Sequence, residues 1–264
     1  MRVIIAFIRN AFQNTYIYRV DFWLRLLASF IMMYATYSLW NILYTQNPTA
    51  FGMNREQMTT YGVLGMMLAP VLDSASFVQY FIGEQVRQGT IELDMVKPLN
   101  FIFHMFSRNL GMFFVQVLLQ GLPAFFFAVA FLDFGLPPTP WHTLMFVCSL
   151  LLGYLIFFAI SLILGMLSIV TLKIDSYIWA YFSLVRFASG QLIPLWMYPP
   201  VLGAIVAFLP FKDVYFTPMS IYIGAVEGDP ARLIVSQVIW VIGLYSIVQL
   251  FWLRVNRRIT IQGG

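Results

Sequence analysis

The sequence predicts an all-α membrane protein that crosses the bilayer several times, and both its composition and its patterning lead to that prediction. Hydrophobic residues make up 61% of the 264 residues, and charged residues make up only 10%. Soluble domains contain about 45–50% apolar and about 25% charged residues. The apolar residues also form long runs, and about 20 apolar residues are enough for a helix to cross a bilayer. A soluble domain with a large core is therefore excluded.

The first twenty residues have the pattern of an amphipathic helix. Apolar side chains at helical spacing share one face and polar side chains share the other. The apolar face holds Val3, Ile4, Phe7, Ile8, Ala11 and Phe12, and the polar face holds Arg2, Arg9, Asn10 and Gln13. Such a helix lies in the membrane interface. We therefore expect an interfacial helix over residues 1–20, with the start of the first span as the alternative.

The spans follow in order along the chain. Five segments are long and apolar enough to cross: Phe22–Tyr44, Met58–Ile82, Leu110–Leu132, His142–Leu172 and Leu233–Leu253. A sixth span is expected at Tyr177–Ile193. Residues 194–224 follow it and contain five prolines. Proline breaks a helix, and a broken helix cannot face lipid with unpaired backbone groups. Residues 194–224 are therefore predicted to form a re-entrant hairpin on the outer side.

The distribution of basic residues sets the orientation. With six spans and both termini cytoplasmic, eleven basic residues lie inside or at the inner boundary: Arg2, Arg9, Arg19, Arg25, Arg87, Lys97, Arg108, Lys173, Arg254, Arg257 and Arg258. Only Arg55, Lys212 and Arg232 lie outside. Cytoplasmic loops carry an excess of lysine and arginine, so this count favours six spans over seven. We expect a multi-pass protein of the bacterial plasma (inner) membrane.

The longest polar interruption is Gly83–Gly111, between the second and third spans, and it carries six charged residues. The six-span topology places it in the cytoplasm. Ile91, Leu93 and Met95 are interleaved with its charges, and protein contacts combine apolar anchors with polar residues in this way. Residues 83–100 are therefore predicted to dock another protein. A solvated loop without a partner is the alternative, and the alternating apolar residues also fit a strand.

The motifs of common enzymes are absent from the sequence. H-E-x-x-H, G-x-S-x-G and the phosphate-binding G-x-x-x-x-G-K-[ST] do not occur, and the chain has only two histidines and one cysteine, Cys148. The chain is thus not expected to hydrolyse ATP, to act as an enzyme or to hold a cofactor or metal. Its arginines form no patch with interleaved aromatic residues, so nucleic acid is not an expected partner. Membrane lipid is.

Two ionisable residues lie inside predicted spans. Asp73 and Arg186 each stand nine residues from the inner end of their span, which places both ~14 Å deep at 1.5 Å per residue. Isolated charges at such depth are costly, so the two side chains are expected to pair. In the alternative, Ser74 and Ser76 hold Asp73, and Arg186 reaches the inner interface.

Four stretches, in order along the chain, carry a resemblance to a known family. They are Gly89–Pro98; Ser189-Gly190 with Pro194 and Pro199; Leu209-Pro210-Phe211 with Pro218 and Gly224; and Arg257-Arg258 with Gly263-Gly264. Together they resemble the permease subunits of type-2 ABC exporters, the half-transporters whose ATPase is a separate chain. Glu92 and Asp94 make the first stretch more acidic than the family's usual pattern.

The resemblance implies a single permease domain over residues 1–264, with an interfacial helix, six transmembrane helices, a cytoplasmic coupling helix after the second span and the outer hairpin before the sixth. It implies a second permease subunit, of the same or a related chain, and cytoplasmic ABC ATPase subunits that bind ATP and magnesium. Implied coupling residues are Glu84, Arg87, Gly89, Ile91, Leu93, Asp94, Lys97 and Pro98. The implied outer gate consists of Ser189, Gly190, Pro194, Pro199 and Pro210.

The function expected from the resemblance is ATP-driven export of a hydrophobic or amphipathic substrate by alternating access. A secondary transporter is the first alternative, although it would normally show internal repeats and more intramembrane ionisable groups. An intramembrane hydrolase is the second alternative, and a membrane assembly subunit without a pathway of its own is the third.

Overall fold

The structure is a computed structural model that describes residues 19–46, 52–91, 100–171, 175–225 and 228–262, and these residues form helices and turns without strands. Within these described residues, five helical segments are long and apolar enough to cross a membrane: Val20–Gln46, Arg55–Arg87, Phe101–Phe131, Pro140–Ile169 and Ala231–Asn256. They coincide with the five long segments predicted from the sequence. The all-α class and these five segments are therefore confirmed, whereas most of the predicted interfacial helix lies outside the described residues.

The elements have the following bounds. α2 (Arg19–Gln46) precedes α3 (Arg55–Asp73), the 3₁₀ turn η1 (Ser74–Ser76) and α4 (Phe77–Arg87). α6 (Phe101–Gln116), the π-helical turn η2 (Val117–Gly121) and α7 (Leu122–Phe131) form the next segment. α8 (Pro140–Thr171), α9 (Asp175–Ala188), η3 (Leu195–Met197), α10 (Pro200–Ala207), η4 (Pro210–Asp213), α11 (Phe216–Tyr222) and α12 (Ala231–Gln262) follow.

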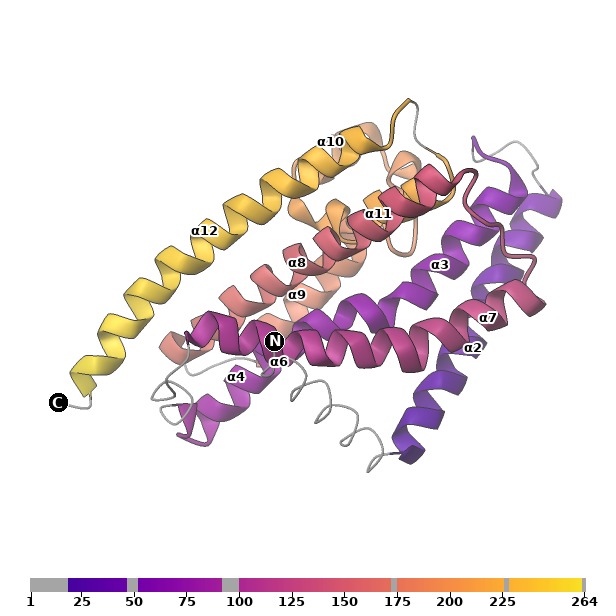
Figure 1. The fold of residues 1–264 in the computed structure, drawn as a ribbon. Coiled ribbons are helices and arrows are strands. Elements are labelled where there is room, and N and C mark those ends of the chain that lie inside the picture. The colour runs from indigo at the N-terminus through magenta and orange to yellow at the C-terminus, as the bar shows by residue number, and fades with distance from the viewer. Residues whose placement is uncertain (1–18, 47–51, 92–99, 172–174, 226–227, 263–264) are drawn as a thin grey trace.

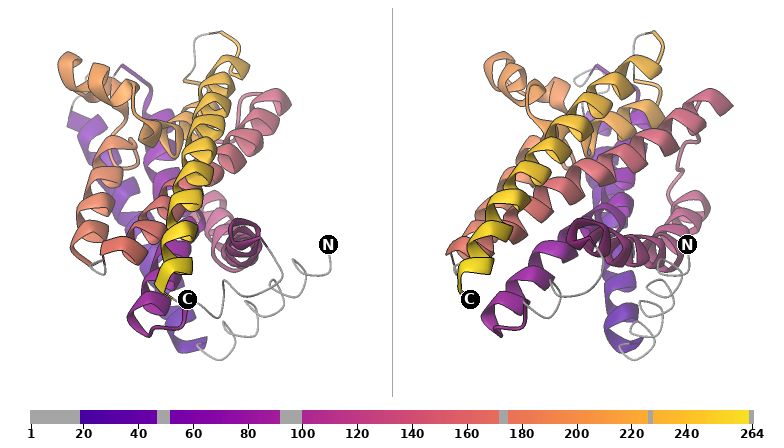
Figure 2. Two further views of the ribbon diagram at one scale, coloured as in Figure 1. Left: turned by 90° about the vertical axis from the view of Figure 1, so that its left-hand side faces the viewer. Right: turned by 60° about the vertical axis from the view of Figure 1, so that its left-hand side comes forward.

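The two longest helices, α8 and α12, run side by side along the molecule (Figure 1). α2 packs against α3, and α4 packs against α8. The short elements α10 and α11 gather at the end of the bundle where α12 begins (Figures 1 and 2). The α3–α4 segment is the most enclosed of the five long segments, since 72% of its most apolar window is buried, against 17% for both α2 and α12.

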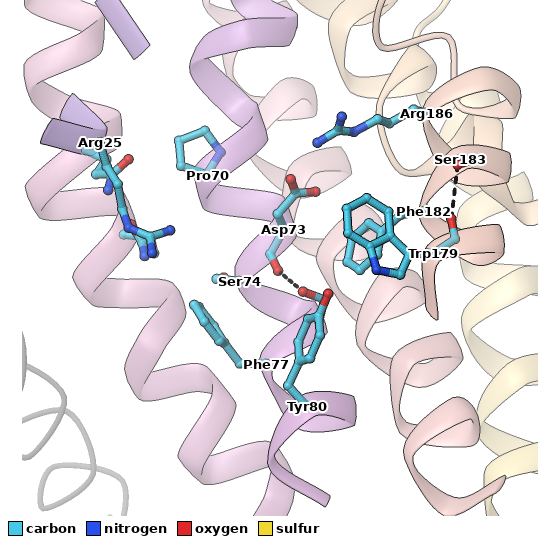
Figure 3. Close-up of a pocket in the computed structure, with 13 residues that line it drawn as sticks. Arg25, Pro70, Asp73, Ser74, Phe77, Tyr80, Trp179, Phe182, Ser183 and Arg186 are labelled. Atoms are coloured by element: carbon cyan, nitrogen blue, oxygen red, sulfur yellow. Dashed lines mark hydrogen bonds between the residues drawn. The ribbon is translucent and has the colours of Figure 1, made fainter. Parts of the chain in front are cut away.

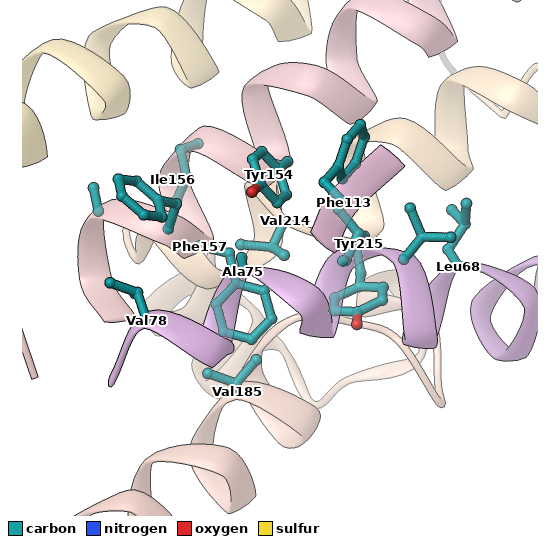
Figure 4. Packing of buried hydrophobic residues seen from close by; sticks show 14 of the residues in the cluster. Leu68, Ala75, Val78, Phe113, Tyr154, Ile156, Phe157, Val185, Val214 and Tyr215 are labelled. Atoms are coloured by element: carbon teal, nitrogen blue, oxygen red, sulfur yellow. The ribbon is translucent and has the colours of Figure 1, made fainter. Parts of the chain in front are cut away.

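The core is formed around this central segment. Side chains of α3, η1 and α4 meet Tyr154 and Phe157 of α8, Phe113 of α6 and Tyr215, which precedes α11 (Figure 4). The outer helices instead expose large apolar side chains, among them Trp23 and Ile31 of α2 and Ile239 and Leu250 of α12. Such faces are stable in lipid and not in water, in agreement with a membrane protein.

Two glycines allow the segment between α9 and α12 to enter the bundle. A Cβ atom on Gly65 of α3 would lie 2.5 Å from the carbonyl oxygen of Gln191, and one on Gly153 of α8 would lie 2.9 Å from that of Val214. Small residues permit such close backbone contact between helices. Gly65 is ten residues into α3, or ~15 Å along its axis. The chain after α9 thus turns within the bundle and not at its end.

Two predicted boundaries are wrong. The expected span Tyr177–Ile193 ends as a helix at Ala188, because Gly190 has φ +72° and the Ser189 carbonyl accepts a hydrogen bond from the Phe216 amide. Its 14 residues extend ~21 Å at 1.5 Å per residue. The polar stretch Gly83–Gly111, which was expected between the second and third spans, is also helical at both ends. α6 begins at Phe101, where the Asn100 side chain caps the Phe103 amide at 3.2 Å.

Candidate functional site

A cavity of about 390 Å³ lies between α2, the α3–α4 segment, the α6–η2 segment and α9 (Figure 3). Its wall contains ionisable and amide side chains together with aromatic rings, although the helices around it are otherwise apolar. The charged and amide residues are Arg25, Asp73, Gln116, Gln120 and Arg186. A concave site with a few convergent polar groups is the usual form of a ligand pocket.

Two irregularities in the helices shape this cavity. Pro70 stands inside α3 and cannot donate the backbone hydrogen bond of a regular helix. The segment then tightens into the 3₁₀ turn η1, so Asp73 lies at the junction. On another wall, the π-helical turn η2 contains Gln120. π-turns inside helices are frequent at functional sites, and here two helix irregularities border the same space.

The Asp73 carboxylate has a partner that the sequence did not indicate. The Tyr215 hydroxyl donates a hydrogen bond to Asp73 Oδ1 at 2.9 Å. The neighbouring hydroxyls of Ser74 and Ser76 donate instead to backbone carbonyls, those of Val71 and Asp73, each at 2.6 Å. The two serines therefore support the 3₁₀ turn and not the carboxylate. Tyr215 was missed because 142 residues separate it from Asp73.

Arg186 extends from α9 toward the same cavity (Figure 3). The structure thus brings together the two intramembrane charges that the sequence singled out. It records no ion pair between them within 4.0 Å. Both charges face a common space, and their direct pairing stays a prediction. Arg25, the other cation on the wall, forms an ion pair with Asp21 at 2.7 Å.

The remaining wall is aromatic and amide in character. Tyr80 and Phe182 stack with their ring centroids 6.2 Å apart, and Phe77 and Trp179 complete the rings around the charges. Gln120 is only 5% exposed, yet its amide has no hydrogen-bond partner among the described residues. Buried polar groups normally have partners, so an unpartnered amide on a cavity wall is available to a ligand.

The coupling residues are described only in part. Glu84 and Arg87 form an ion pair on the exposed end of α4. Gly89, with φ +67°, ends this helix, and its amide bonds to the Val86 carbonyl at 3.2 Å. Ile91 is buried. Leu93, Asp94, Lys97 and Pro98 belong to residues 92–99 of the predicted coupling segment, which lie outside the described residues.

The predicted outer-gate residues are held in place by hydrogen bonds. The buried Tyr61 hydroxyl of α3 donates to the Gly190 carbonyl at 2.6 Å, and the Ser189 carbonyl accepts from Phe216. Pro194 immediately precedes η3, Pro199 precedes α10, and Pro210 opens η4. The prolines thus divide this segment into short elements, as their fixed φ and missing amide require.

A second buried carboxylate, Asp213 of η4, was not singled out by the sequence. Its carboxylate accepts hydrogen bonds from Thr217 at 2.7 Å and from Ser236 of α12 at 2.8 Å. The Gln237 amide donates to the Asp213 carbonyl at 2.8 Å and to the Ser149 carbonyl of α8 at 3.0 Å. This cluster joins η4 to α8 and α12. The four-residue spacing of Asp213 and Thr217 was the available local signal.

Comparison with known proteins identifies a family. The family model described as "ABC-2 family transporter protein" matches residues 30–263. No curated protein and no solved structure matches the chain. The match includes the cavity wall apart from Arg25, the predicted coupling stretch and the short elements between α9 and α12.

Proposed function

The chain belongs to the ABC-2 family of transporter proteins, and from this premise we propose that it is the membrane-spanning subunit of an ATP-driven exporter. The proposal is carried by the family match, which extends over 30–263 and thus over most of every long apolar segment. A separate ABC ATPase would bind ATP and magnesium in the cytoplasm. A second permease subunit, the same chain or a related one, would complete the transporter and alternate with it between inward- and outward-facing states.

The proposed topology has six spans with cytoplasmic termini, and α9 forms the shortest of them. The early end of α9 supports a re-entrant hairpin, because the chain that follows already contacts Gly65, ~15 Å along α3. Ser189 and Gly190 join α9 to this hairpin and form its outer gate with Pro194, Pro199 and Pro210. The cavity at Asp73 and Arg186 serves as the substrate site on the path between the two sides.

The conformational change that ATP drives in the ATPase is transmitted to the permease through residues 83–100. The end of α4 supports this role, since its Glu84 and Arg87 are exposed and its helix packs directly on α8. The Arg108 guanidinium lies 3.7 Å from the centre of the Phe81 ring, a cation–π contact that joins α4 to α6. A displacement at this end therefore reaches both helices that border the stretch.

The test is purification of the tagged chain from its own membrane, followed by ATP turnover in nanodiscs. We expect a co-purifying ATPase. Leu93→Asp and the double reversal Arg87→Glu/Lys97→Glu should each reduce ATPase binding or substrate-stimulated turnover, while the permease still inserts. Arg232→Glu, a charge reversal at the start of α12, is the matched control and should leave both unchanged.

Several outcomes would overturn parts of the proposal. Wild-type binding and turnover in both coupling variants would remove residues 83–100 as the docking segment. Transport by the isolated chain, driven by an ion gradient without any ATPase, would make it a secondary transporter. A chain that forms a complex but supports no transport would be an assembly subunit.

A further inference from the structure

The cavity between α3 and α9 presents two opposite charges that are not bonded to each other. Asp73 lies on one wall and Arg186 on another, with no ion pair between them within 4.0 Å (Figure 3). Within the described residues, the Asp73 carboxylate has one hydrogen bond, from Tyr215. The Arg186 guanidinium has no hydrogen bond or ion pair within the described residues. A ligand with one charge would satisfy one side chain and leave the other unpaired.

The other ionisable residue on the wall does not disturb this balance. Arg25 is engaged with Asp21 at 2.7 Å, one turn away on the same helix. The charges available to a ligand are thus one negative and one positive. Gln120, 95% buried and unpartnered within the described residues, adds an amide that both donates and accepts hydrogen bonds. This set of groups is complementary to a polar group that carries both charges.

The rim of the cavity is apolar. Trp179, Tyr80 and Phe77 line the cavity and are 76%, 47% and 39% exposed. An alkyl chain attached to the bound polar group would lie against these rings and continue toward the lipid. Aromatic faces also attract cations, so a cationic group near Asp73 gains a second contact.

From these observations we propose that the cavity binds the head group of a zwitterionic amphiphile, with its cation at Asp73 and its anion at Arg186. The inference rests on the proposed transport function, because it names the substrate class of that same site. Gln120 supplies the neutral hydrogen-bonding group, and the exposed rings hold the start of the apolar chain.

The experiment measures binding to the purified permease in nonionic maltoside micelles, without ATPase or ATP. Three probes share one brominated dodecyl tail and carry a sulfobetaine, a trimethylammonium or a sulfate head group. The chain has seven tryptophans, and quenching of Trp179 fluorescence reports binding. The variant Trp179→Phe gives the signal of the remaining tryptophans. We expect the sulfobetaine to bind the wild type about tenfold more tightly than either singly charged probe, because it alone satisfies both charged side chains and a tenfold change corresponds to about 1.4 kcal/mol.

Charge-neutral variants test the assignment of each end. Asp73→Asn leaves a net positive site and should shift the preference to the sulfate probe, whereas Arg186→Gln should shift it to the trimethylammonium probe. Arg232→Gln, the same chemical change outside the cavity, should keep the wild-type order. If the pair has only a structural role, Asp73→Asn and Arg186→Gln should each weaken the binding of all three probes equally.

The outcomes separate this inference from the proposed function. Equal affinities for the three probes in the wild type, or variants that lose all binding without a change in preference, overturn the inference even if ATP-driven transport is found. Conversely, the expected order of affinities in a chain that supports no ATP-driven transport would retain the site and refute the proposed exporter.

Discussion

Gly190 provides a sharp test of how the segment after α9 is held. Its φ of +72° lies in the left-handed region, and a Cβ atom there would be 2.9 Å from Cβ of Phe216. Its carbonyl accepts the 2.6 Å hydrogen bond from Tyr61, which limits any shift of the backbone. Replacement of Gly190 by alanine therefore introduces backbone strain and a steric overlap at the same position.

The expected loss of stability in Gly190→Ala follows from these two effects. A non-glycine residue in the left-handed region costs ~1–2 kcal/mol, and overpacking in a buried site costs ~1–3 kcal/mol. Alanine also lowers the conformational entropy of the unfolded chain, which stabilises the folded protein by ~0.4–1 kcal/mol. We therefore expect Gly190→Ala to lower the free energy of unfolding by about 1–5 kcal/mol, with a central value of about 3 kcal/mol. Transport should also be impaired, while assembly with partner subunits is retained.

Two other glycines separate the effects. Gly52 has φ +71° but no atom within 4 Å of its virtual Cβ, so Gly52→Ala should show the strain alone, about 1 kcal/mol. Gly203 lies inside α10, and its nearest neighbours are 3.9 Å away. Gly203→Ala should be neutral or stabilising by up to ~1 kcal/mol.

The assay is equilibrium unfolding of the purified permease in micelles by titration with sodium dodecyl sulfate, followed by tryptophan fluorescence. Transport is measured in reconstituted vesicles with the ATPase. If Gly190→Ala is no less stable than Gly52→Ala, the steric contact with Phe216 has no effect and the reasoning is refuted. Loss of assembly in Gly190→Ala would contradict a gating role and favour a purely structural one.

Two further predictions concern topology and pH. In a Cys148→Ala background, an impermeant thiol reagent should label Asp229→Cys in intact cells but Gly264→Cys only after permeabilisation; the opposite pattern would end the six-span topology. The pKa of Asp229 lies below its usual 3.8 because its carboxylate accepts hydrogen bonds from the Ala231 amide and the Trp141 indole. The stabilising effect of Asp229 should therefore be present at neutral pH and be lost as the pH falls below 3.8 and through the lowered pKa. The Tm values of wild type and Asp229→Ala should differ at pH 7 and converge in that acid range. A difference that stays constant with pH would exclude this linkage.

The sequence predicted those features of the fold that arise from local chemistry. Long apolar runs predicted the five candidate spans because the requirement for about 20 apolar residues acts on each run separately. The prolines predicted an interrupted segment after α9, because each proline acts on its own backbone. The boundary at Ala188 was missed because Leu192 and Ile193 continue the apolar pattern after Gly190, and hydropathy does not register the left-handed turn.

The features that sequence analysis missed depend on distant residues. Tyr215 reaches Asp73, and Ser236 and Gln237 reach Asp213, only because the chain after α9 folds back against α3, α8 and α12. The π-helical turn at 117–121 likewise has no marker in hydropathy. Asp73 and Arg186 could be selected because a charge in an apolar run is conspicuous. Their common cavity required the three-dimensional structure.

The way α9 is attached has a mechanical consequence. Among the described elements, α9 packs chiefly against η4, whereas η4 itself is joined to α8 and α12 by the Asp213 cluster. α9 is therefore attached mainly at one end, and the turn at Gly190 is the point about which it rotates. α9 carries Arg186, whereas the enclosed α3 carries Asp73. A rotation of α9 about Gly190 would change the separation of the two charges, and it would also move Tyr181 and Val185, which α9 contributes to the core. The distance between Asp73 and Arg186 would therefore report such a rotation.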